Sequence, residues 1–318
     1  MEILRHIDEY QLSIPCPVLT LGSFDGLHLG HKALLRRVVD EAKKLGGRSM
    51  VLTFEPHPLK VLVPSRAPRL ILNHKDKILL LRDCGADVVI IQNFDAEFAR
   101  IEAKDFVDQF LVGRLGVRQV WVGKDFAFGK GKKGRVDQLV QWGAEKGFEV
   151  GVMDAVIVDG ERVSSSRIRQ LIEGGDVGKA NRLLGRNHFI SGRVGTGHQR
   201  GRTLGFPTAN IVSRTEMVPA SGIYATFLEV HQRQWPSVTS IGYNPTFGPG
   251  PKTIESHVLD FADNLYGQAV RLHFAARIRE ERTFSSPELL VAQMQKDVAA
   301  AQKILAAAEA VEAVGTSD

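Results

Sequence analysis

Two different patterns of hydrophobic and polar residues divide the chain. In the first half, short apolar runs alternate with stretches whose apolar residues recur every three or four positions. The apolar runs predict strands at Val18–Leu21, Ser49–Phe54, Val88–Ile91, Val120–Val122 and Val150–Met153. The helical stretches lie between and around them, at residues 34–45, 73–83, 103–114 and 137–146. This alternation predicts a parallel sheet with helices on both faces, whose ligands bind at the carboxyl ends of the strands.

The pattern changes after Gly185. Short β-type runs then follow, separated by turns rich in glycine and proline, at Ile223–Val230, Val238–Ile241, Ile254–Asp260 and Val270–Phe274. Such runs predict a small barrel or sandwich. An apolar stripe from Leu290 to Leu305 predicts a closing helix. We therefore expect an α/β domain over residues 1–185 and a β domain with a C-terminal helix over residues 186–318.

Composition narrows the class of protein. The 318 residues are 43% hydrophobic and 24% charged, as in ordinary soluble proteins. A net charge of +5 favours polyanionic ligands but is too small and too dispersed for a dedicated nucleic-acid binder. Only two cysteines occur, which excludes a disulfide framework or a cysteine-rich zinc site. With no signal-like or membrane-length apolar run, we expect a cytoplasmic protein without a membrane or nucleic-acid partner.

The first predicted strand leads into a glycine-rich segment with two histidines. The string GSFDGLHLGH occupies residues 22–31. His28 and His31 are three positions apart on a first helical turn, so they share a face, and Gly30 between them allows a ligand to approach the backbone. Imidazole N–H groups at a helix N-terminus suit a phosphate. A helix cap and part of a metal site are plainer interpretations of the same pair.

Two further clusters lie at or after later strands. The string TFEPHP at residues 53–58 ends the second strand and places His57 between two prolines. The string VSSSRIR at residues 163–169 offers hydroxyl groups at a helix start and two arginines, which are groups that bind a triphosphate. Each cluster alone is also typical of ordinary structure. Three clusters at strand ends together favour a nucleotide site.

These segments resemble the FMN adenylyltransferase module of bacterial bifunctional riboflavin kinase/FAD synthetases, within the nucleotidyltransferase superfamily. The resemblance implies a Rossmann-like fold and transfer of AMP from ATP to FMN, with His28 and His31 stabilising the ATP phosphates. The nucleotide-binding residues that it implies are Gly22, Phe24, Asp25, Gly30, His57, Ser165, Ser166, Arg167 and Arg169. A further family block, VGKDFAFG at residues 122–129, implies flavin contacts by Asp125, Phe126 and Phe128.

The sequence departs from that family at three positions. Ser166 stands where Thr is usual, Ala127 where Arg is frequent, and Ile71 where Thr is usual. The serine keeps the hydroxyl group. The other two departures bear on ligand contacts rather than on the reaction.

A glycine pattern at residues 129–134 also fits the dinucleotide fingerprint GxGxxG, and Asp154 follows where a ribose-binding acid would stand. That fingerprint needs a strand that leads directly into a helix, whereas residues 124–128 intervene here. We expect instead a basic loop that closes over phosphates, or a plain surface loop.

The string GRTLGFPTAN at residues 201–210 lies near the start of the β-rich half, after a glycine-rich stretch that can wrap a phosphate tail. Thr208 and Asn210 are two positions apart, so they face the same way in an extended chain. With nucleotide phosphates, their oxygens could complete a magnesium site. Such a segment alone is merely a turn in most proteins.

Glu255 lies in a strand-like run in which alternation places Thr253 and His257 on the same face. A carboxylate on a rigid strand can accept the proton of an attacking hydroxyl group. An exposed strand glutamate without a catalytic role fits the same pattern.

The second half resembles the riboflavin kinase family. The matching blocks are GRxLGFPTAN, GIYA at 222–225, IGxxPTF at 241–247, the strand of Glu255, LYG at 265–267 and RxExxF at 279–284. The resemblance implies a six-stranded β-barrel, Mg²⁺ held with ATP by Thr208 and Asn210, and Glu255 as the general base for the ribityl 5′-hydroxyl. It further implies nucleotide contacts by Gly197, Gly201 and Arg202 and a flavin contact by Arg279. His198 and Asn244 depart from the family's frequent Asp and Arg.

The paired resemblances cover residues 15–300 and predict one bifunctional enzyme. It would phosphorylate riboflavin to FMN and then join AMP to FMN to give FAD, with ATP as co-substrate and Mg²⁺ as cofactor. The expected partners are riboflavin, FMN and ATP, and a homo-oligomer is left open. Two alternatives are a nucleotidyltransferase for another phosphorylated acceptor and a non-catalytic flavin-binding regulator.

Overall fold

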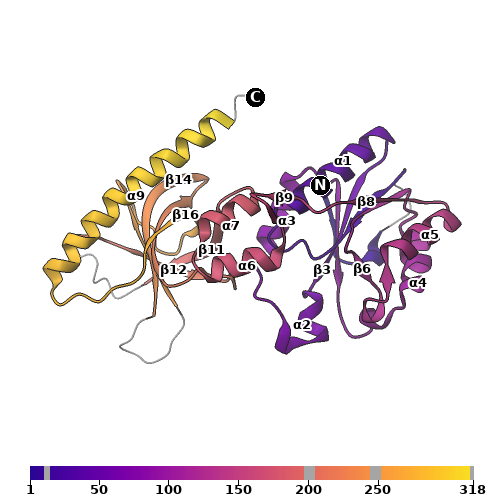
Figure 1. Ribbon diagram of the computed structural model, residues 1–318, viewed down its shortest axis with the longest axis horizontal. Helices are drawn as coiled ribbons and strands as arrows, with labels where there is room; N and C mark the ends of the chain where they lie inside the picture. Colours follow the sequence, from indigo (N-terminus) through magenta and orange to yellow (C-terminus); the bar gives the residue numbers. More distant parts are fainter. Residues whose placement is uncertain (11–14, 197–204, 244–251, 316–318) are drawn as a thin grey trace. The chain divides into compact units, whose positions relative to one another are not determined.

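The computed structural model describes residues 1–10, 15–196, 205–243 and 252–315, with side chains up to residue 308. By its contacts the chain divides into two compact units (Figure 1). The first comprises Met1–Arg69 and His74–Ser164, and the second comprises Leu70–Asn73 and Ser165–Asp318.

The first unit contains a six-stranded sheet with the strand order β1-β4-β3-β2-β5-β8. Every neighbouring pair is parallel. The strands are β1 (Glu2–Leu4), β2 (Val18–Leu21), β3 (Ser49–Glu55), β4 (Val88–Asn93), β5 (Gln119–Gly123) and β8 (Glu149–Met153). The five strands predicted from apolar runs are thus confirmed, and the short edge strand β1 is an addition.

Helices cover both faces of this sheet, as the apolar runs require. The side chains of Leu19, Met50 and Val120 face one core, which includes Leu111 and Leu139. The opposite face packs Val18 against Val38 and Ala42. The helices are α1 (Leu29–Lys44), α2 (Pro58–Leu62), α3 (His74–Asp83), α4 (Ala103–Asp105) continued by a π-helix (Phe106–Arg114), and α5 (Val136–Lys146). The predicted doubly covered parallel sheet is therefore confirmed.

Two small hairpins extend the loops at the carboxyl ends of β5 and β8. One pairs β6 (Ala127–Phe128) with β7 (Gly134–Arg135), and the other pairs β9 (Ile157–Val158) with β10 (Glu161–Arg162). Neither hairpin belongs to the main sheet. Arg162 of the second hairpin forms an ion pair with Asp125, which lies between β5 and β6.

In the described part of the chain, the second unit is a closed barrel with two helices before it and one after it. Its strands, in the order β11-β12-β15-β14-β13-β16, are all antiparallel to their neighbours. They are β11 (His188–Gly195), β12 (Ala209–Ser213), β13 (Gly222–Val230), β14 (Arg233–Gly242), β15 (Thr253–Val258) and β16 (Ala269–Arg279). Helices α6 (Ser165–Glu173) and α7 (Val177–Leu184) precede the barrel. The predicted six-stranded barrel is confirmed.

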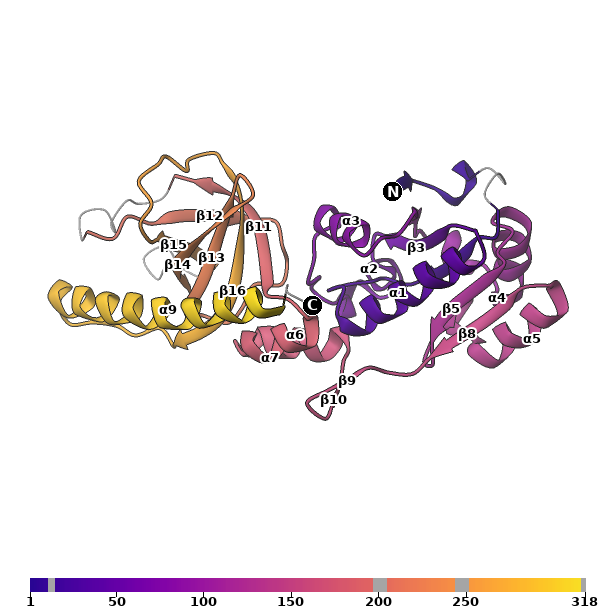
Figure 2. The ribbon, with the colours of Figure 1, turned by 90° about the horizontal axis from the view of Figure 1, so that it is seen from above.

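Alternation along the strands fills the barrel and attaches the last helix. Inward side chains such as Leu228, Ile254 and Phe274 form one buried cluster. On the outside, Phe227 packs against Ala301 and Leu305 of α9 (Pro287–Gly315), which lies along the barrel (Figure 2). The predicted closing helix is thus present and extends beyond Leu305. No helix within the described ranges is long and apolar enough to span a bilayer.

Candidate active sites

The first candidate site lies where β2 leads into α1. His28 is the N-cap of α1, and its Nδ1 accepts a hydrogen bond from the backbone N–H of His31 at 3.2 Å. Because Nδ1 is an acceptor, the neutral ring carries its proton on Nε2 and can donate there. The capping interpretation of His28 is therefore correct.

The rings of His28 and His31 are stacked, with centroids 3.6 Å apart and an angle of 15° between their planes. Burial, and secondarily the charge of His28, hold the pKa of His31 well below its usual value. The Nδ1 atom of His31 is buried and has no hydrogen-bond partner among the described residues. Without a ligand, the His31 ring is consequently neutral at physiological pH.

The loop before His28 has an unusual backbone. Phe24, Gly26 and Leu27 have positive φ angles of 47°, 84° and 42°. Phe24 is 2% exposed and its ring lies edge-on to that of His31, with centroids 5.2 Å apart. The Phe24 ring thus packs against the His31 ring. Asp25, the next residue, is also buried and is 5% exposed. The loop forms a scaffold for the two histidines.

The structure gives a separate reason for a glycine at position 30. A Cβ atom added at this position would lie 3.2 Å from Cε1 and Nδ1 of His28. The missing side chain therefore makes room for the capping ring, in addition to any ligand that approaches the backbone. Gly22 is less constrained, since its added Cβ would meet the Phe24 ring at an ordinary 3.5 Å.

His57 resembles His28 in its local role. It is the N-cap of α2, and its Nδ1 accepts a hydrogen bond from the backbone N–H of Leu59 at 3.2 Å. The short helix follows the carboxyl end of β3, so His57 lies at the edge of the sheet where β2 also ends. The parallel register places both capping histidines after neighbouring strands.

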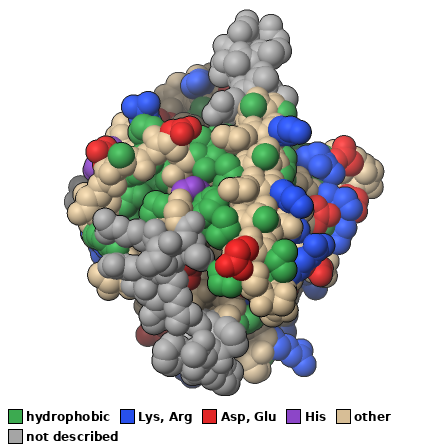
Figure 3. Space-filling view, turned by 90° about the vertical axis from the view of Figure 1, so that its left-hand side faces the viewer, with side chains coloured by type: hydrophobic (Ala, Val, Ile, Leu, Met, Phe, Trp, Pro, Cys, Tyr) green, Lys and Arg blue, Asp and Glu red, His purple; other side chains and the backbone are tan. Residues whose placement is uncertain are grey.

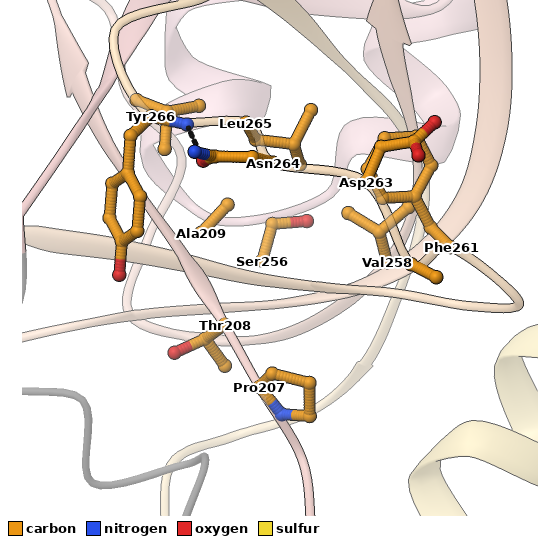
Figure 4. Close-up of a pocket in the computed structure, with 12 residues that line it drawn as sticks. Pro207, Thr208, Ala209, Ser256, Val258, Phe261, Asp263, Asn264, Leu265 and Tyr266 are labelled. Atoms are coloured by element: carbon orange, nitrogen blue, oxygen red, sulfur yellow. Dashed lines mark hydrogen bonds between the residues drawn. The ribbon is translucent and has the colours of Figure 1, made fainter.

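A second candidate site lies on the barrel, around a cavity of about 510 Å³ (Figure 4). Strands β12 and β15 and the segment after β15 form its wall. The residues that line it include Thr208, Ala209, Val258, Phe261, Asn264 and Tyr266. Asn264 fixes the rim, because its Oδ1 accepts a hydrogen bond from the backbone N–H of Tyr266 at 2.9 Å. Figure 3 shows the face of the molecule that lies on the left in Figure 1, and apolar side chains gather on this face.

Three polar side chains converge beside this cavity. In the ladder between β12 and β15, Asn210 is the register partner of Glu255. The hydroxyl group of Thr208 donates to Glu255 Oε2 at 3.4 Å. Just beyond, Nδ1 of His257 lies 2.8 Å from the carbonyl oxygen of Pro207. Two segments almost 50 residues apart in the sequence thus bring the hydroxyl group of Thr208 and the amide group of Asn210 to the strand that carries the Glu255 carboxylate.

Comparison with known proteins assigns both halves. The FAD synthetase family model matches residues 13–167, and the riboflavin kinase family model matches residues 184–305. A bifunctional riboflavin kinase/FMN adenylyltransferase of Pseudomonas fluorescens is 39% identical over 313 residues, which are 96% of this chain and 98% of the relative. The chain belongs to this bifunctional family. It is a riboflavin kinase and FMN adenylyltransferase that uses ATP to make FMN and FAD.

Other relatives agree on the family and the fold. The bifunctional enzyme of Escherichia coli K12 is 38% identical over 281 residues, covering 88% of this chain and 90% of the relative. A crystal structure described as a macrolide-efflux protein from Streptococcus pneumoniae has a TM-score of 0.86 and 30% identity, and it covers 94% of this chain and 98% of that one. That name describes the pneumococcal protein and is not applied to this chain. The match of both enzymatic domains argues against the two alternative functions.

In this flavin-synthesising enzyme, the residues predicted to hold the nucleotide are divided between the two units. Ser165, Ser166, Arg167 and Arg169 lie on α6, which groups by its contacts with the barrel rather than with the sheet that carries His28. The domain boundary at residue 185 stays a prediction, and the family models leave residues 168–183 between their ranges. Gly197, Gly201 and Arg202 lie outside the described residues, as do His198 and Asn244.

The predicted flavin contacts in the first unit have partners within the protein. Asp125 forms an ion pair with Arg162 of β10. Phe126 and Phe128 stack with centroids 5.4 Å apart, and Phe128 is 8% exposed against Phe106 of the core. Phe128 therefore anchors the β6–β7 hairpin, whereas Asp125 remains largely exposed to solvent.

The dinucleotide fingerprint at residues 129–134 is excluded by its context. The main strand β5 ends at Gly123, and α5 begins at Val136, after the β6–β7 hairpin. An added Cβ at Gly129 or Gly134 would lie 2.6 Å from atoms of Ala103. These glycines therefore serve close packing of the hairpin on α4. Lys130 in the intervening loop pairs with Glu102 at 2.9 Å.

Arg279, predicted to contact flavin, has a further role that the sequence did not indicate. Its Nη2 lies 2.7 Å from Oδ2 of Asp297 and its Nε lies 2.9 Å from Oδ1. The two side chains are 12% and 4% exposed. The ion pair joins β16 to α9. The flavin contact of Arg279 stays a prediction.

Sequence reasoning missed several residues of the barrel cavity. Phe261, Asn264 and Tyr266 line it, yet only the block LYG at residues 265–267 was noted, without a role. The block LYG was the sequence signal that could have indicated this cavity. In the first unit, the buried Lys77 beside Thr53 was also missed, because a single lysine in a helical stretch carries no motif.

Proposed function

We propose that each unit carries one of the two reactions. AMP transfer to FMN would occur at the carboxyl edge of the parallel sheet, at His28 and His31. Phosphorylation of riboflavin would occur on the barrel, at Thr208, Asn210 and Glu255. The observation that carries the proposal is the contact of Thr208, just before β12, with Glu255 of the neighbouring strand β15, which is also the register partner of Asn210 on β12.

In the adenylyl transfer, a phosphate oxygen of FMN attacks the α-phosphorus of ATP and pyrophosphate leaves. The Nε2–H group of His28 and the N-terminus of α1 are suited to stabilise the negative charge of the transferring group. An anionic phosphate beside His31 would oppose the effect of burial and favour the protonated ring. Gly22, Asp25 and His57 would complete the part of the nucleotide site that lies on the first unit.

In the kinase reaction, the ribityl 5′-hydroxyl group attacks the γ-phosphorus of ATP, the bond from that phosphorus to the β,γ-bridging oxygen breaks, and ADP leaves. Glu255 would accept the proton of that hydroxyl group, because its carboxylate lies on a rigid strand and has oxygen lone pairs beyond the one that Thr208 occupies. Thr208 and Asn210 would hold Mg²⁺, for which a hydroxyl and an amide oxygen beside a carboxylate are suitable donors. When bound, the ion neutralises charge on the phosphates.

The barrel cavity would bind the nucleoside part of ATP. Thr208 lines the cavity and also contacts Glu255, so a nucleotide with its base inside would direct its phosphates toward the reacting groups. Apolar walls from Val258, Phe261 and Leu265 suit a stacked base. We further propose a cytoplasmic location, where ATP is available to both reactions.

A flavin assay tests this division. Purified protein is incubated with ATP, Mg²⁺ and either riboflavin or FMN, and the products are separated by chromatography. The proposal expects Glu255→Gln to block conversion of riboflavin but not of FMN, and His31→Ala to show the reverse. If a folded single variant lost both activities, the assignment of one reaction to each unit would be wrong.

A further inference from the structure

Lys77 is a buried lysine on α3 that belongs to no motif. Its side chain is 7% exposed. The ammonium group donates to the hydroxyl oxygen of Thr53 at 3.2 Å and to the carbonyl oxygen of Phe54 at 3.4 Å. Burial of an ammonium group is unfavourable unless hydrogen bonds and opposite charges compensate it. The contacts of the Lys77 ammonium group therefore indicate which segments this side chain holds in place.

The contacts of Lys77 continue to the loop that carries the histidines. Thr53 is fully buried at the end of β3, and its hydroxyl group donates to the carbonyl oxygen of Ser23 at 3.4 Å. Ser23 immediately precedes the segment in which Phe24 and Leu27 have positive φ angles. Non-glycine residues adopt such angles only where surrounding contacts impose them. Thr53 is one of those contacts, and Lys77 holds Thr53.

The charges around Lys77 come from the same junction. Burial lowers the pKa of Lys77, and attraction by Glu55 and Asp25 offsets part of that effect. Glu55 is at the end of β3 and also pairs with His74, at the start of α3, at 3.3 Å. Asp25 is a buried residue of the histidine loop itself. The ammonium group thus links α3, β3 and this loop.

We infer that Lys77 is a positioning residue for adenylyl transfer: through Thr53 and the Ser23 carbonyl group, it holds the loop that presents His28 and His31. The inference rests on the proposed role of these histidines. Lys77 acts through its neighbours and not on the substrate. Misplacement of reacting groups by about 1 Å can cost roughly 100-fold in rate, so a small movement of the loop is sufficient.

The test compares Lys77→Met, Thr53→Val and their double variant with Lys75→Met, an exposed lysine on the same helix. We expect Lys77→Met and Thr53→Val each to lower the kcat of FAD formation roughly 10- to 100-fold with little change in KM for ATP. The double variant should be no worse than the more impaired single variant, because both changes break one chain of contacts. Thr53→Ser keeps the hydroxyl group and should retain activity, as should Lys75→Met.

Riboflavin kinase activity of the same preparations reports folding of the second unit, and thermal unfolding reports the first. If Lys77→Met lowers only the melting temperature and keeps the kcat of FAD formation, Lys77 is merely structural and the inference is overturned. Independent, additive losses in the double variant would overturn it as well. Full FAD formation by His31→Ala would reject the proposed histidine role itself, and this inference with it.

Discussion

Asn210 and Glu255 are direct register partners across strands β12 and β15 of the barrel. The pairing fixes both side chains on one side of the ladder, while their neighbours Ala209 and Ser256 face the interior. Thr208 adds a hydrogen bond to the same carboxylate. The groups that we propose as general base and metal ligands are thus positioned by the backbone of the barrel, which favours a fixed reactive arrangement.

This arrangement predicts the behaviour of Glu255→Gln. The amide keeps the size of the side chain but cannot accept the proton, so riboflavin phosphorylation should fall about 100- to 10,000-fold. The initial rate of FMN formation from riboflavin and ATP measures the effect. Adenylylation of added FMN is the internal control. A kinase rate within threefold of the parent would mean that Glu255 is not the base.

His28→Asn separates capping from catalysis. Asparagine is among the best N-cap residues, so α1 should begin normally and the thermal stability should be retained. The imidazole donor is lost, and removal of one such donor typically costs about 100- to 1,000-fold in rate. We therefore expect FAD formation to fall while the melting temperature stays unchanged. His28→Ala, which loses both the cap and the donor, is the matched comparison and should be less stable.

The ion pair between Arg279 and Asp297 predicts how α9 is held on the barrel. Asp297→Ala leaves a largely buried guanidinium group without its counter-charge, which should lower the free energy of unfolding by about 3–5 kcal/mol. Denaturant unfolding measures this change. Asp83→Ala, which breaks the exposed pair with Arg82, is the control and should cost less than about 1 kcal/mol.

The same residues can test the predicted flavin contact of Arg279. If Arg279 only anchors α9, Arg279→Met and Asp297→Ala should change the KM for riboflavin to the same extent. A much larger increase for Arg279→Met would show that its guanidinium group also contacts the flavin.

His188 predicts a pH dependence of stability. Burial against Phe274 lowers the pKa of His188 from 6.5 to about 3. The folded state therefore binds fewer protons than the unfolded state between these values. Stability contributed by the neutral ring is complete above pH 6.5 and declines as the pH falls, by up to about 1.4 kcal/mol per pH unit.

Unfolding measured between pH 7 and pH 4 checks this effect. His188→Phe removes the titrating group and should reduce the slope, even if the variant is less stable at pH 7. The exposed His231→Asn is the control and should keep the parent slope. A slope that is identical in His188→Phe and the parent would show that His188 does not titrate in this way.

The sequence by itself determined the α/β and barrel folds, the strands of the parallel sheet and the chemical groups that we propose for the two candidate sites. Buried strands must be apolar, and loops that bind phosphate need glycine. Both requirements can be read from a short stretch of sequence, as at Val18–Leu21 and at residues 22–31. The histidine cap was also among the interpretations that the local pattern offered.

Only the tertiary structure decided which distant residues meet. The pairing of Asn210 with Glu255, the chain of contacts from Lys77 to Ser23, and the ion pair of Arg279 with Asp297 all join segments far apart in the sequence. It also grouped α6 with the barrel and gave Gly129 and Gly134 a packing role. Local patterns record what each segment requires of its own backbone, whereas burial, register and ion pairing depend on the neighbours that folding supplies.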